Sequence, residues 1–196
     1  MEKMKLSICF GILLLASTQA PGALLVPDSD TRAPLSQLRL RAAGRDRDAI
    51  LALGYKNDRE AVPLLKKLAT SDKPYTARAA LTRMRAADHM NDFVVGLSTT
   101  NRVWKINCIL FLGYIHDKRA IKHLVPLLDD NSGFENDSGD NITMPVSAHA
   151  ALAMSDSLED EVKKIRKADP SRGMSSPTAW KQWWETNKVN YSGLER

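Results

Sequence analysis

Cysteine is scarce in this sequence, which contains only Cys9 and Cys108. Cys9 lies in an apolar run near the start of the chain, so removal of that run would leave one thiol and no internal disulfide. Cys108 lies among aliphatic residues in a predicted helix, where we expect a buried and inert thiol.

Signatures of catalysis are missing as well. The four histidines are scattered, without an HExxH motif or paired His/Cys spacing, so no metal site is predicted. The sequence has no nucleophile elbow, phosphate-binding loop or pair of catalytic carboxylates. We therefore expect a protein that is not an enzyme and that uses no cofactor.

The chain has little excess of either charge. It has 28 Lys and Arg against 23 Asp and Glu, a formal net charge of +5. This mild excess, without a nucleic-acid-reading motif, argues against a nucleic-acid partner. The 43% hydrophobic content is ordinary for a globular protein, and 196 residues predict one domain.

Residues 1–20 have the organisation of a secretory signal peptide. Lys3 and Lys5 precede an apolar run at residues 6–16, and small residues follow up to Ala20. The run is too short for a comfortable membrane span. We expect a periplasmic or secreted protein with no membrane span after cleavage; an uncleaved anchor is the alternative.

A sequence motif occurs twice, at double a period of about thirty residues. GYKNDREAV at residues 54–62 is echoed by GYIHDKRAI at residues 113–121, and the two glycines are 113 − 54 = 59 residues apart. Apolar residues at i, i+3, i+4 and i+7 around each copy predict pairs of amphipathic helices. No segment alternates with period two, so the predicted fold class is all-α.

Two kinds of residue mark the expected helix ends. Asp58, Asp88 and Asp117 each precede a predicted second helix, where a carboxylate can cap free backbone N–H groups. Gly54 and Gly113 are expected to end the first helices in a left-handed conformation.

These residues together resemble HEAT repeats of the phycobilisome-lyase type. The pattern A-x-A-L-G-x-x-x-D-x-x-A-[VI]-x-x-L-[LV] is carried by residues 49–65 and 109–125. The resemblance implies a short right-handed α-solenoid of HEAT-type helix pairs, with the second helices lining a concave binding surface. It implies no particular function, because such repeats serve many unrelated tasks.

The repeats divide the chain into segments. Residues 21–45 are predicted to form a linker and an N-terminal cap helix, residues 46–170 the repeats, and residues 171–196 a tryptophan-rich cap helix and tail. An acidic insert at residues 129–145 interrupts the repeats. A disordered insertion is the favoured interpretation, and calcium binding is the alternative.

Basic side chains on the predicted second helices are the first candidate binding residues: Arg59, Lys67, Arg119, Lys122 and His123. On a concave surface they would favour an acidic protein or peptide partner, whereas a solvated charged face is the other interpretation. We expect reversal of Arg119 and Lys122 to Glu to weaken binding without lowering thermal stability.

Three aromatic residues share one face of the last predicted helix. Trp180, Trp183 and Trp184 have i, i+3, i+4 spacing. Closure of the last repeat's core is the favoured interpretation, and stacking on a sugar is the alternative. The leading hypothesis is an exported scaffold or adaptor for a protein or peptide. The others are a module that binds carbohydrate or envelope polymer, and an accessory subunit of an enzyme.

Overall fold

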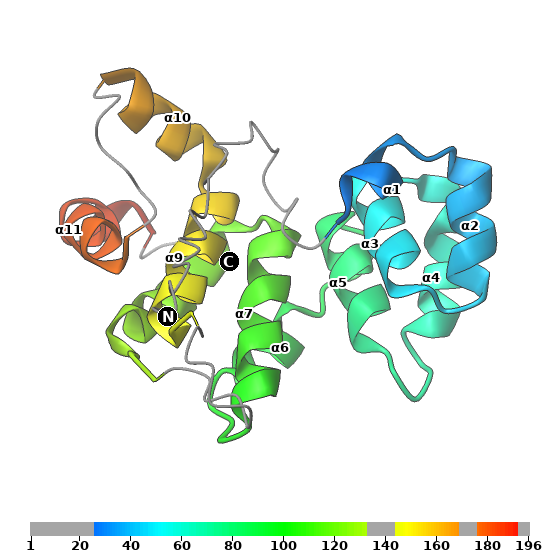
Figure 1. Cartoon of the computed structure of the whole chain (residues 1–196), viewed down its shortest axis with the longest axis horizontal. Coiled ribbons are helices and arrows are strands. Elements are labelled where there is room, and N and C mark those ends of the chain that lie inside the picture. The colour runs from blue at the N-terminus through cyan, green and yellow to red at the C-terminus, as the bar shows by residue number, and fades with distance from the viewer. Residues whose placement is uncertain (1–25, 133–143, 169–175, 192–196) are drawn as a thin grey trace, which may run out of the picture.

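The computed structural model describes residues 26–132, 144–168 and 176–191, and in these residues it contains helices and turns without a strand (Figure 1). The α-helices are α1 (Asp28–Arg32), α2 (Leu35–Ala43), α3 (Arg47–Tyr55), α4 (Val62–Leu68), α5 (Tyr75–Arg83), α6 (Met90–Gly96), α7 (Arg102–Ile115), α8 (Ile121–Leu124), α9 (Val146–Ser157), α10 (Glu159–Ala168) and α11 (Pro177–Asn187). Short 3-10 helices are η1 (Arg59–Ala61), η2 (Lys118–Ala120), η3 (Val125–Asp129) and η4 (Lys188–Tyr191). The all-α prediction is confirmed. The predicted signal peptide and most of the acidic insert lie outside the described residues.

The helices are arranged as successive pairs. The longer first helices form a row in which α3 packs on α5, α5 on α7 and α7 on α9 (Figure 1). The shorter second helices pack on the next member of this row: α4 on α5, α6 on α7, and α8 on α9. At the two ends, α2 covers α3, and α11 covers α9 and η3.

Aspartate side chains lie at the start of the second helix in the first three pairs, as predicted. The Asp58 carboxylate accepts a hydrogen bond from the Glu60 backbone N–H at 3.3 Å, and Asp117 accepts from Arg119 N–H at 2.9 Å. Asp88 accepts from Met90 N–H at 3.0 Å. Each carboxylate satisfies a donor that the helix itself leaves without a partner.

The two repeated glycines do not end their helices, so that prediction is wrong. Gly54 and Gly113 lie inside α3 and α7, where the next first helix approaches most closely. A Cβ atom on Gly113 would lie 2.8 Å from the Cα atom of Ala153 in α9. The left-handed conformation falls three residues later instead, at Asn57 (φ 54°) and His116 (φ 58°). Glycine is needed here for close helix packing, which is a tertiary requirement.

Tyr114 ties three members of the row together. Its buried hydroxyl donates a 2.6 Å hydrogen bond to the carbonyl oxygen of Leu51, which lies two first helices away in α3. The Arg83 guanidinium of the intervening α5 lies 5.0 Å from the ring centres of both Tyr55 and Tyr114. Burial raises the pKa of the Tyr114 hydroxyl well above its usual value, so it remains a donor at physiological pH.

The tryptophans of α11 close the C-terminal end of the core. Trp180 is 0% exposed and Trp183 is 8% exposed, which confirms the packing interpretation for these two rings. Their ring centres lie 5.2 Å apart with the planes nearly perpendicular, and Tyr191 packs on Trp183 at 5.4 Å. Trp184 is half-buried beside them. Trp180 and Trp183 therefore present no open ring face for a sugar.

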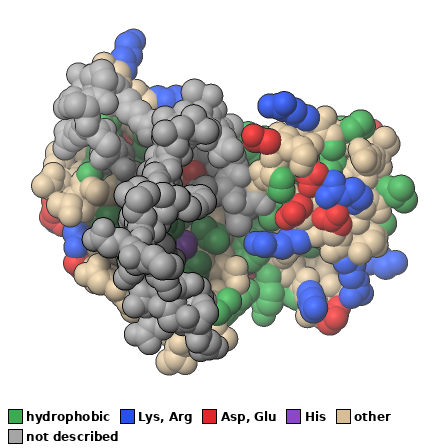
Figure 2. Space-filling view, viewed as in Figure 1, with side chains coloured by type: hydrophobic (Ala, Val, Ile, Leu, Met, Phe, Trp, Pro, Cys, Tyr) green, Lys and Arg blue, Asp and Glu red, His purple; other side chains and the backbone are tan. Residues whose placement is uncertain are grey.

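Several basic side chains on the N-terminal helices pair with acidic ones. Figure 2 shows the two kinds interspersed over these helices. Arg39 pairs with the buried Asp58 at 2.6 Å, and Arg41 pairs with Asp46 at 2.8 Å. The hydrogen bond from Arg41 is the main reason that the pKa of Asp46 lies below its usual value. The net positive charge does not gather into a single strip on this face.

Candidate functional site

Three consecutive turns line a groove of about 700 Å³, which we call the turn groove. Each turn follows a first helix: residues 82–88 come at the end of α5, residues 116–119 at the end of α7, and residues 157–161 at the end of α9. Because α5, α7 and α9 stack side by side, their ends fall next to one another. The repeat architecture therefore builds the groove from residues about thirty to forty positions apart in sequence.

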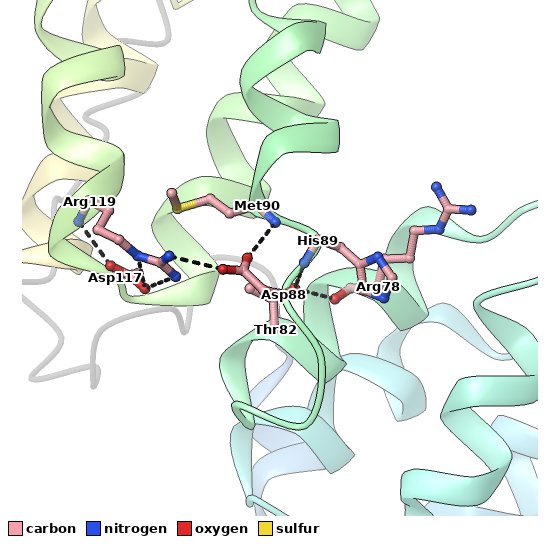
Figure 3. A network of polar contacts seen from close by, with 7 residues as sticks. All are labelled: Arg78, Thr82, Asp88, His89, Met90, Asp117 and Arg119. Carbon is pink, nitrogen blue, oxygen red and sulfur yellow. Dashed lines mark hydrogen bonds and ion pairs between the residues drawn. The ribbon is translucent and has the colours of Figure 1, made fainter. Parts of the chain in front are cut away.

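Thr82 fixes the first turn of the groove (Figure 3). Its hydroxyl donates to the carbonyl oxygen of Arg78 at 2.8 Å and accepts from the backbone N–H of His89 at 3.0 Å. Between these anchors, Arg85 adopts the left-handed conformation with φ 54°. Arg85 is exposed in the groove and forms no ion pair with another described residue.

Arg119 joins the first turn to the second (Figure 3). Its guanidinium donates to Asp117 from Nε at 3.0 Å and from Nη2 at 2.8 Å, and to Asp88 from Nη1 at 2.9 Å. One cation thus lies between two carboxylates that also cap helices. This arrangement holds the two turns at a fixed separation.

The pKa values show that this cluster stays charged. The hydrogen bond from Met90 N–H is the main cause that lowers the pKa of Asp88, and Arg119 adds to it. Burial alone would raise the pKa of Asp117, but the hydrogen bonds from the Arg119 side chain and backbone outweigh it, so that the pKa is lowered. The side-chain hydrogen bonds to Asp117 and Asp88 raise the pKa of Arg119. These carboxylates are ionised at neutral pH and are poorly suited to proton transfer.

The third side of the groove is the junction between α9 and α10. Ser157 is 2% exposed, and its hydroxyl oxygen has no hydrogen-bond partner among the described residues. The first turn of α10 follows with Glu159, Asp160 and Glu161 in the groove wall. Glu159 and Glu161 pair with lysines of their own helix, whereas Asp160 is exposed and forms no ion pair with another described residue.

The charges that line the groove sum to a negative value. Three cationic side chains, Arg85, Lys118 and Arg119, face five carboxylates. With His116 counted as neutral, the net charge of the lining is −2. The lining therefore has the sign opposite to that of the whole chain, and Lys163 and Lys164, which pair with Glu159 and Glu161, offset two of these negative charges.

The five predicted basic residues are spread over η1, α4, η2 and α8. Of the five, only Arg119 lines the turn groove. Arg59 and Lys67 are exposed on η1 and α4, and Lys122 and His123 are half-buried on α8, all outside the groove.

The ion pairs of Arg119 change the effect on stability that we expect from charge reversal. A glutamate at position 119 would place a third carboxylate beside Asp88 and Asp117, and it would remove the ion pairs that both form with Arg119. The double reversal is therefore expected to lower thermal stability, and a loss of binding in that variant would not identify a binding face.

Ser157 and the first turn of α10 were not predicted from the sequence as part of a site. They fall outside the repeat motif, since no glycine or capping aspartate marks the fourth helix pair. The one signal in the sequence is the acidic run at residues 159–161.

Other reactive groups in the described residues offer no competing site. Burial raises the pKa of the Cys108 thiol to about 12, so it is protonated and unreactive at neutral pH. In the described ranges, no three His, Cys, Asp or Glu side chains converge as a set of metal ligands. No helix in these ranges combines the length and apolar character required to cross a bilayer.

Comparison of the chain with protein-family models, with curated proteins and with solved structures finds no match.

Proposed function

We propose that this chain is a HEAT-type α-solenoid that serves as an exported binding module, and that its turn groove holds a segment of a protein or peptide partner. The row of stacked first helices and the motif at residues 54–62 and 113–121 support the solenoid. The pattern of residues 1–20 supports export to the periplasm or beyond.

The observation that carries this proposal is that one groove spans three consecutive turns. Its volume of about 700 Å³ is within the range of sites that enclose most of a ligand's surface. Capping bonds at Asp88 and Asp117 and the bridge through Arg119 hold its walls before any partner arrives. Such preorganisation lowers the entropic cost of binding.

A binding role fits the chemistry of the groove better than catalysis. Two carboxylates of the groove, Asp88 and Asp117, form ion pairs with Arg119 and have lowered pKa values. A general acid or base needs a pKa near the working pH instead. The thiol of Cys108 is buried in the core and does not line the groove.

Display of a random peptide library against the purified protein tests this proposal. Enriched peptides should bind wild type and lose at least about tenfold in affinity on Lys118→Trp, which fills the groove from an exposed position. The matched control is Lys66→Trp, an equally exposed lysine on α4 outside the groove. No enrichment over an unrelated helical protein, or equal loss in both variants, would refute the proposal.

A further inference from the structure

We infer that the partner inserts a lysine or arginine side chain into the turn groove, against Ser157 and the first turn of α10. This inference rests on the proposed function, because it names the chemical class of the group that the groove receives. It reverses the sign of the partner that the basic residues of the sequence suggested.

The charge of the first turn of α10 favours a cationic ligand. Asp160 is an exposed carboxylate without an ion pair among the described residues, and Glu159 and Glu161 stand on either side of it. The lysines that pair with Glu159 and Glu161 belong to the same helix, and their side chains are 66% and 72% exposed. Such intrahelical pairs contribute little free energy, so a partner's cation can replace them at low cost.

The buried hydroxyl of Ser157 favours a ligand that donates hydrogen bonds. A buried polar atom without a hydrogen-bond partner destabilises the fold, so its presence in the groove wall calls for a reason. An ammonium group has three donors and a guanidinium group five, and neither has an acceptor. One such group can donate to the Ser157 oxygen and to a carboxylate of α10 at the same time.

Other ligand classes satisfy these two features less well. An anion would face the three carboxylates of residues 159–161 at the same site. An apolar group would leave the Ser157 hydroxyl and the Asp160 carboxylate without partners and partly desolvated. A metal ion lacks a converging ligand set among the described residues.

Titration calorimetry with short capped peptides tests the inference directly. The probes are acetyl-Gly-Gly-X-Gly-Gly-amide with X as lysine, arginine, norleucine or glutamate. We expect binding of the lysine and arginine probes and no measurable binding of the other two. Asp160→Asn should weaken the lysine probe by roughly threefold to tenfold, whereas Asp72→Asn, an exposed carboxylate outside the groove, should leave it unchanged.

Ser157→Ala separates a ligand role from a merely structural one. Removal of the buried hydroxyl should raise the Tm of the free protein and also weaken the lysine probe by at least about threefold. A raised Tm with unchanged affinity would assign Ser157 to the fold alone and remove it from the site, which overturns the inference as stated.

The outcomes distinguish this inference from the proposed function. Groove-dependent display peptides without a basic residue, together with no binding of the lysine probe, would overturn the inference and leave the binding module standing. Binding of the lysine probe that Lys118→Trp leaves unchanged would place the cation outside the groove and would overturn the inference. Equal binding of the lysine and norleucine probes would also overturn the inference.

Discussion

Gly113→Ala is the substitution that most sharply tests the packing of the helix row. In an isolated helix this change stabilises by about 1 kcal/mol, because alanine is the better helix former. In this protein the new Cβ atom would lie 2.8 Å from the Cα atom and 3.0 Å from the Cβ atom of Ala153. Carbon atoms pack at about 3.5–4.0 Å, so α7 and α9 would have to separate.

The expected magnitude follows from these two opposing contributions. Overpacking of a close contact costs about 1–3 kcal/mol, and we expect the upper part of that range, about 2–3 kcal/mol, because the obstructing atom is backbone and cannot rotate away. After the helix-propensity gain, the net loss in the free energy of unfolding should be about 1–2 kcal/mol. For a chain of this size, that loss lowers the Tm by roughly 2–8 °C.

Urea denaturation, monitored by far-ultraviolet circular dichroism, measures this effect. We expect a lower midpoint concentration of urea and an unchanged dependence of the free energy of unfolding on urea concentration. Gly44→Ala is the control, since Gly44 is exposed after α2 with φ −79° and should change stability by less than about 0.5 kcal/mol. Adding Ala153→Gly to Gly113→Ala should recover only part of the loss, because the new methyl group would still press on the backbone of α9. A neutral or stabilising effect of Gly113→Ala would refute the close approach of α7 and α9.

Three further predictions concern charge and the C-terminal cap. Arg119→Glu should lower the urea midpoint, with a smaller effect at 1 M salt, whereas Lys66→Glu should not. Trp183→Ala should cost about 3 kcal/mol or more and lower the Tm in calorimetry by several degrees. Folding lowers the pKa values of Asp88 and Asp117. Their contribution to the free energy of unfolding is therefore complete above the unfolded-state pKa of about 4, and it is lost as the pH falls through the pKa values of the folded state. The urea concentration at the midpoint should therefore fall when the pH is lowered below about 4. This fall should be less steep in Arg119→Met than in wild type.

Local features of the fold were predictable from sequence. The capping role of Asp58, Asp88 and Asp117 depends only on carboxylates placed before a helix, and the structure confirms it. The i, i+3 spacing of Trp180 and Trp183 likewise defines a buried helix face, whatever the two rings pack against.

Features that depend on which helices meet were not predictable in the same way. Gly113 was assigned to a helix end because glycine is common there, but its role is set by Ala153, forty residues later. Arg119 was assigned to an open basic face because its partner Asp88 lies 31 residues earlier in the chain. The turn groove itself arises only when three such turns stack.

Chemical-shift mapping of a display-selected basic peptide on the isotopically labelled protein is the most direct test of the account. We predict that the perturbed amides cluster at residues 82–88, 116–119 and 157–161, and that Lys118→Trp abolishes the changes. Perturbations centred on α4 or α11, with those three turns unaffected, would contradict the turn groove as the binding site.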